Sequence, residues 1–117
     1  MQKLLLILNA PPYGSERTLS ALRLASALVN TEPQPELHLF LLSDAVVCAL
    51  SGQMAASGES LADMLNGLTT AGADVRICRT CASARGVDET RLLAGVRIGT
   101  MPELAQWALE ADKVISF

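Results

Sequence analysis

Two of the three cysteines lie close together in the segment "VRICRTCASARG" (75–86), as Cys78 and Cys81. Arg79 directly follows the first, and Arg85 lies four residues after the second. A C-x-x-C pair can bind a metal, form a redox disulfide, hold one reactive thiolate, or pack as two small hydrophobic side chains. Guanidinium groups turned toward a thiol would favour the thiolate, because nearby positive charge lowers a thiol's pKa.

A metal site is the weakest of these four possibilities. A structural zinc site needs four ligands, and one C-x-x-C pair supplies two. The remaining candidates, Cys48 and His38, fall on other predicted elements. Only a site shared between two subunits would complete four thiolates, so we expect no metal and no cofactor.

A redox pair of the thioredoxin type needs a strand followed by a helix, with the first cysteine where the helix starts. The stretch "ICRTC" (77–81) meets that requirement but lacks the aromatic and Gly-Pro residues usual in such motifs. Disulfide exchange therefore stays open beside a single activated thiolate.

The composition predicts a single, oligomeric domain and argues against a nucleic-acid-binding or membrane protein. The 117 residues suit one domain over 1–117, and half of them are hydrophobic while 18% are charged. A small domain cannot hide so much apolar surface alone, so we expect an oligomer. Nine scattered basic residues and 3% aromatics argue against nucleic-acid binding. The first apolar run, 4–8, is too short for a signal or membrane segment, which predicts a cytoplasmic protein without a membrane partner.

Short apolar segments alternate with helical patterns along the whole chain. The predicted strands are "KLLLILN" (3–9), "ELHLFLLSD" (36–44), "ADVRIC" (73–78), "GVRIGT" (95–100) and "DKVISF" (112–117). The predicted helical segments are 15–30, 45–52, 59–72, 80–84 and 102–111. This alternation predicts a three-layer α/β/α sandwich with a mostly parallel five-stranded sheet.

Polar residues before three of the helices read as caps. Ser15 precedes the first helical segment, with Glu16 in its first turn, and Ser43 or Asp44 precedes the second. Thr100 and Glu103 have the T-x-x-E spacing of a capping box. Cys48 falls inside the second helical segment, where we expect a buried and unreactive thiol.

Ligands of parallel α/β folds gather outside the carboxyl ends of the strands. Three loops should meet there: 10–16, 43–46 and 78–86. We therefore expect Tyr13, Gly14, Ser15 and Asp44 to line one cleft with the cysteine pair. The segment "SGQMAASGES" (51–60) reads as a flexible connection or lid.

Four stretches, in this order and spacing, resemble the DsrE/DsrF-like family of small sulfur-relay proteins, and most closely its YchN-like branch. They are "NAPPYGSE" (9–16), "LFLLSDAV" (39–46), "ICRTCASARG" (77–86) and "IGTMPELAQWALEADKVISF" (98–117). The resemblance implies a flavodoxin-like α/β/α fold and assembly as trimers or hexamers. Some members carry sulfur as a persulfide on a cysteine whose position here is Cys78. Cys81 matches the C-x-T-C pattern of the YchN-like branch, which the sulfur-carrier branches do not share, and Arg85 with Gly86 matches the following R-G.

The resemblance thus implies a sulfurtransferase-type carrier. Cys78 would take sulfane sulfur from a donor persulfide and give it to an acceptor thiol, with Arg79 and Arg85 favouring the anionic sulfur. Cys81 could attack the Cys78 persulfide, releasing sulfide or forming a disulfide. The partners would be further copies of the chain, as a homotrimer or homohexamer, and a sulfur donor or acceptor protein. The alternatives are a C-x-x-C redox protein and a non-catalytic binding protein. The sequence contains no nucleotide-binding motif, so a binding protein would have another ligand or a protein partner.

Overall fold

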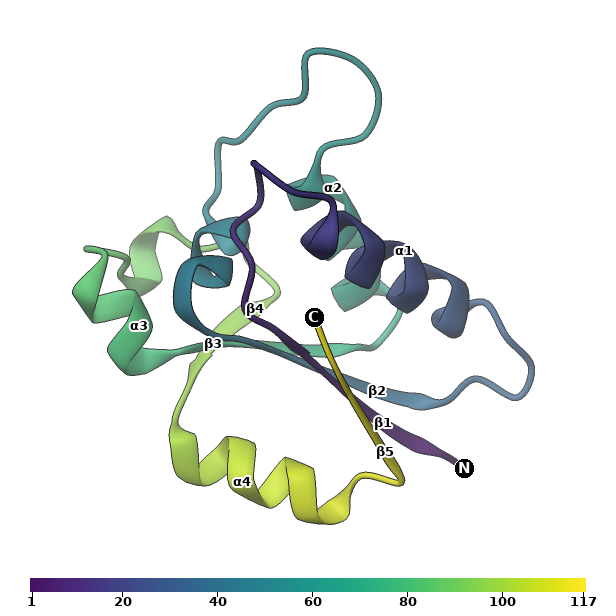
Figure 1. The fold of residues 1–117 in the computed structure, drawn as a ribbon. Coiled ribbons are helices and arrows are strands. Elements are labelled where there is room, and N and C mark those ends of the chain that lie inside the picture. Colours follow the sequence, from purple (N-terminus) through teal and green to yellow (C-terminus); the bar gives the residue numbers. More distant parts are fainter.

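The computed structural model describes all 117 residues, which form five strands, four α-helices and two short 3₁₀-helices (Figure 1). Along the chain these are β1 (Lys3–Leu8), α1 (Arg17–Val29), β2 (Glu36–Leu41), η1 (Ser43–Ala49), α2 (Leu61–Thr70), β3 (Asp74–Cys78), α3 (Arg79–Ala84), η2 (Glu89–Arg91), β4 (Val96–Gly99), α4 (Met101–Glu110) and β5 (Lys113–Ser116). Every predicted strand is present. The second predicted helix is instead the 3₁₀-helix η1, which begins two residues earlier than expected.

The strands form one parallel sheet in the order β4-β3-β2-β1-β5. The central strand is β2, and its residues Glu36–Leu41 pair in register with Lys3–Leu8 of β1. Buried leucines dominate both strands, as expected for a parallel sheet that is covered on its two faces. The predicted α/β class with a parallel five-stranded sheet is confirmed, and no strand runs antiparallel.

Helices cover the sheet from both sides. Helices α1 and α2 pack against each other on one face, and α4 lies across the opposite face (Figure 1). The short elements η1 and α3 follow the carboxyl ends of β2 and β3 and pack together at that edge of the sheet. This is the three-layer sandwich that the sequence predicts. No helix is both long enough and apolar enough to span a lipid bilayer.

Trp107 anchors α4 to the sheet. Its ring meets His38 edge-on at 4.3 Å and Phe40 at 6.0 Å between ring centroids. The Arg76 guanidinium lies 4.5 Å above the same ring and pairs with Asp74 and Glu103 at 3.0 and 2.8 Å. His38 is thus held in a packing arrangement between the sheet and α4.

The predicted helix caps are partly wrong. The capping box of Thr100 and Glu103 is present. Ser15 is not the N-cap residue of α1, because that position falls on Glu16, whose side chain makes no cap hydrogen bond; the Ser15 hydroxyl still accepts from the Arg17 N–H at 3.4 Å. Neither Ser43 nor Asp44 caps η1, because the N-cap position falls on Leu42, which has no side-chain acceptor. Ser43 also has a left-handed φ of 52°, far from the extended backbone of a capping residue.

Candidate thiol site

Cys78 lies where β3 ends and α3 begins. It is the last residue of β3, paired with Gly99 of β4, and it is also the N-cap residue of α3. A side chain on Gly99 would collide with the Phe40 ring at 2.9 Å, so only glycine fits beside this strand end. The thiol is therefore fixed by the sheet and stands at its carboxyl edge, as predicted.

Hydrogen bonds around Cys78 favour its thiolate. The residue is 2% exposed, and its Sγ lies 3.2 Å from the Thr80 hydroxyl oxygen. Burial by itself raises the pKa of Cys78, but this effect is outweighed by the Thr80 hydroxyl, the backbone N–H and thiol of Cys81, and the Thr80 N–H. The net result is a pKa below the ordinary thiol value, in a side chain that solvent scarcely reaches.

Cys81 is the more accessible thiol of the pair. It is half-buried, whereas Cys78 is buried. With Cys78 at the N-cap position, Cys81 is the third residue of α3. The same two positions carry Ser60 with Asp63 in α2 and Thr100 with Glu103 in α4, where both form capping boxes. At α3 no side-chain cap hydrogen bond forms, but the spacing places both cysteines on the first turn of the helix.

Arg85 does not act on the thiols as the sequence suggested. Its Nε donates to Asp44 Oδ1 at 2.9 Å, and its NH1 group donates to the Cys81 carbonyl at 3.1 Å. Arg85 thereby ties the end of α3 to the start of η1, and its charge is paired. Arg79 is exposed and has no ion-pair partner. Neither arginine is among the groups that lower the pKa of Cys78.

Thr80 is the contributor that sequence reasoning missed. Its hydroxyl is the only side chain in hydrogen-bond contact with Cys78 Sγ apart from the thiol of Cys81. The signal was present in the C-x-T-C pattern, because a hydroxyl residue two positions after an N-cap residue can turn back to it.

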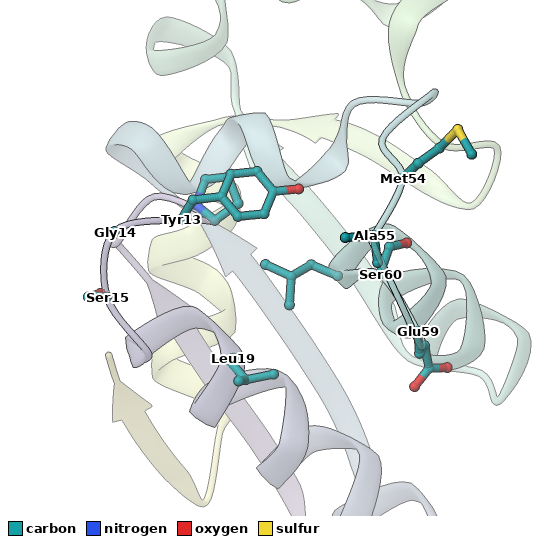
Figure 2. A pocket seen from close by; sticks show the side chains of 11 residues that line it. Tyr13, Gly14, Ser15, Leu19, Met54, Ala55, Glu59 and Ser60 are labelled. Atoms are coloured by element: carbon teal, nitrogen blue, oxygen red, sulfur yellow. The ribbon is translucent and has the colours of Figure 1, made fainter.

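A pocket of about 480 Å³ opens beside the loop that follows β1 (Figure 2). Its walls come from that loop, α1, the segment 51–60 and the start of α2, through Pro12, Tyr13, Gly14, Ser15, Leu19, Met54, Ala55, Ala56, Glu59, Ser60 and Leu61. Figure 2 shows Tyr13 and Met54 on opposite sides of the opening. Six of the eleven lining residues are hydrophobic, and Glu59 is the only charged one.

The single cleft that the sequence predicts is not formed. The structure has a pocket and, apart from it, the thiol site. Tyr13, Gly14 and Ser15 line the pocket, whereas neither cysteine nor Asp44 does. Tyr13 donates to Gln53 Oε1 at 3.1 Å, and Gln53 in turn donates to the carbonyls of residues 47, 48 and 50 at the end of η1. Asp44 at the start of η1 holds Arg85 of the thiol site, whereas the carbonyls at its end hold Gln53 beside the pocket, so η1 lies between the two places.

Cys48 takes no part in the site. It is fully buried within η1, and burial raises its pKa from 9.0 to about 12 despite an opposing hydrogen bond with Thr18. This agrees with its prediction as an unreactive thiol. Neither Cys48 nor His38 joins the cysteine pair, since no three His, Cys, Asp or Glu side chains converge as metal ligands.

The family model described as "DsrE/DsrF-like family" matches residues 2–117. The chain belongs to the DsrE/DsrF-like family. Among its relatives, Protein YchN of Escherichia coli is 47% identical over 117 residues, with both chains covered completely. MK0008 of Methanopyrus kandleri is 37% identical over 112 residues, which are 95% of this chain and 90% of the relative.

Two solved structures agree with this fold. The crystal structure of YchN from E. coli superposes with a TM-score of 0.95 at 47% identity, over 100% of both chains. MTH1491 from Methanobacterium thermoautotrophicum superposes with a TM-score of 0.80 over 100% of both chains at 15% identity, which speaks for the fold alone. The resemblance seen in the sequence is thus confirmed at the level of the family.

Proposed function

We propose that this protein carries sulfane sulfur as a persulfide on Cys78. The observation that carries the proposal is the buried Cys78 thiol, whose pKa is lowered by the Thr80 hydroxyl and by the N–H and thiol of Cys81 in spite of its burial. A persulfide is anionic near neutral pH, so the same hydrogen bonds favour it. Membership of the DsrE/DsrF-like family supports a sulfur-relay role.

The chemistry needs no cofactor. The Cys78 thiolate attacks the outer sulfur of a persulfide R–S–SH; the S–S bond breaks, and R–S⁻ leaves with the electron pair. Cys78 then carries –S–SH, and an acceptor thiolate removes the outer sulfur by the same displacement. Each step exchanges one S–S bond for another, as in thiol–disulfide exchange.

We propose further that the protein works as a homotrimer or homohexamer. The large hydrophobic side chains at the surface are Met1, Tyr13, Met54, Met101, Leu109 and Val114. The sheet also ends in two open edges, β4 and β5, and an exposed edge strand invites pairing with another chain. Association of copies would cover such surface.

Intact mass spectrometry tests the carrier function. The wild-type protein is incubated with a cysteine desulfurase and cysteine, beside Cys48→Ala and the double variant Cys78→Ala/Cys81→Ala. We expect the mass of one added sulfur atom in the first two and none in the double variant. A loss of two hydrogens instead of a gain would show a redox pair, and an unchanged wild-type mass would refute the carrier function.

A second candidate function is binding of a small, largely apolar ligand. The pocket beside Tyr13 favours it, because its size and mostly hydrophobic lining suit such molecules. Native mass spectrometry of the protein as purified would reveal a bound molecule. A Leu19→Arg variant, which places a charge in the pocket wall, should lose it, while Arg79→Ala at the thiol site should keep it.

A further inference from the structure

The two thiols of the C-x-x-C pair differ in access. Cys78 is 2% exposed, and the hydroxyl of Thr80 occupies the space beside its sulfur. Cys81 is half-buried, so part of it reaches solvent. A donor protein that brings its own persulfide must align three sulfur atoms in a row, and this needs open space in front of the attacking sulfur. Judged by exposure, Cys81 is open to such an approach and Cys78 is almost closed to it.

The pair is also built so that sulfur can pass between its members. Cys78 and Cys81 take the N-cap and third positions of α3, which face each other in the two capping boxes of this chain. Arg85 holds that geometry, because it binds the Cys81 carbonyl at 3.1 Å and Asp44 of η1 at 2.9 Å. The turn that presents Cys81 to Cys78 is thereby fixed to the rest of the molecule.

We propose that Cys81 is the receiving thiol, and that it hands the sulfane sulfur on to Cys78. This inference rests on the proposed carrier function. In the first step the Cys81 thiolate attacks the outer sulfur of the donor persulfide and the donor thiolate leaves. In the second step the Cys78 thiolate attacks the outer sulfur of Cys81–S–SH, the S–S bond breaks, and Cys81 recovers its thiolate. No sulfur is gained or lost, and no oxidant or reductant is needed.

In this relay the two cysteines have different roles. Cys81 meets the partner protein, and Cys78 stores the sulfur out of reach of thiols in solution. The hydrogen bond to Thr80 and the N–H groups at the start of α3 suit Cys78 to hold an anionic sulfur. Delivery to an acceptor follows the same route in reverse.

Loading rates test the relay. Wild type, Cys81→Ala, Cys81→Ser and the matched control Cys48→Ala are mixed with a desulfurase and cysteine, and the added sulfur is followed over time by intact mass. We expect Cys48→Ala to load at the wild-type rate and both Cys81 variants to load at least about tenfold more slowly, a barrier change of about 1.4 kcal/mol. The fluorescence of Trp107, the single tryptophan, checks that each variant is folded.

The outcomes separate the relay from the carrier function. If wild type loads and both Cys81 variants load equally fast, the relay is wrong and Cys78 receives sulfur directly. If wild type itself takes up no sulfur, the carrier function fails and the relay with it. If Cys81→Ala alone is slow and Cys81→Ser loads at the wild-type rate, the thiol is unnecessary and the relay is again refuted.

Discussion

Two cysteines of this chain are buried to a similar degree and differ in chemistry. Cys48 lies within η1 among apolar side chains, and burial raises its pKa to about 12. Cys78 stands at a strand end, where hydrogen bonds outweigh burial and its pKa is lowered. The hydrogen bonds available at the strand end therefore decide the direction in which the pKa of a thiol shifts, although both side chains are almost inaccessible to solvent.

Removal of the Thr80 hydroxyl should raise the pKa of Cys78. Thr80→Val keeps the shape of the side chain but loses the hydrogen bond at 3.2 Å, so burial is opposed by fewer partners. The pH dependence of alkylation, read on the Cys78 peptide, measures the change. Thr80→Ser retains the hydroxyl and should titrate like wild type; a Thr80→Val profile that does not move would contradict the role given to Thr80.

Cys48 should make the protein less stable in alkali. The unfolded thiol loses its proton from about pH 9, whereas the folded one keeps it until about pH 12. Between these values the unfolded state binds fewer protons, so the free energy of unfolding falls as pH rises, by up to about 1.4 kcal/mol per pH unit. Urea denaturation of wild type and Cys48→Ala at several pH values measures this; equal slopes in both proteins would exclude a buried, neutral Cys48.

At the residue scale, the sequence placed the cysteine pair at the carboxyl end of β3 but misjudged its surroundings. The C-x-x-C spacing and the strand before it predicted the position of Cys78. The pairing of Arg85 with Asp44 was out of reach, because it joins residues 41 positions apart through the packing of α3 on η1. The sequence therefore predicted that Arg85 would lower the pKa of Cys78. In the structure, hydrogen bonds from Thr80 and Cys81 have this effect.

The helix starts show at the element scale what local sequence can decide. The box of Thr100 and Glu103 was predictable, because both partners lie within one turn and the N-cap backbone is extended. Ser15 and Ser43 have capping side chains but stand in the wrong backbone: η1 starts after the extended Leu42, and Ser43 itself is left-handed. A capping residue is useful only where the chain enters the helix in the β region.

Two glycines should respond in opposite ways to the same substitution. Gly67 lies in α2 with no atom near a new Cβ, so Gly67→Ala should stabilise the fold by about 0.5–1 kcal/mol through helix propensity. Gly99→Ala should cost about 1–3 kcal/mol, because its Cβ would meet Phe40 at 2.9 Å and Arg76 at 3.2 Å. Chemical denaturation measures both, and a Gly99→Ala protein as stable as wild type would contradict this account of the β3–β4 edge.

At the scale of the whole molecule, the alternation of strands and helices was enough to predict the sandwich. The strand order was not predictable from that pattern, which contains no information on which strand lies beside which. The pocket was also beyond the sequence, because it depends on how the segment 51–60 folds back over the loop after β1. Tyr13 and Gln53, whose hydrogen bond closes that arrangement, lie 40 positions apart.

The protein should sediment as a trimer or hexamer. Lysine at Leu109 and Val114, which are 82% and 47% exposed, adds charge to an exposed helix position and to an edge strand without disturbing the core. We expect this double variant to shift toward smaller species in sedimentation velocity, while Asn66→Lys, at an exposed polar position of α2, leaves the assembly unchanged. A wild-type protein that sediments as a monomer would contradict the proposed assembly.

The most direct test of the central claim locates the sulfur atom. Trypsin cleaves after Arg76, Arg79 and Arg85, so the two thiols fall on different peptides, 77–79 and 80–85. After wild-type protein is loaded to completion, freed of donor and digested, we expect the additional sulfur atom on the 77–79 peptide, which contains Cys78. Additional sulfur only on the 80–85 peptide, or on neither, would contradict the assignment of Cys78 as the sulfur carrier.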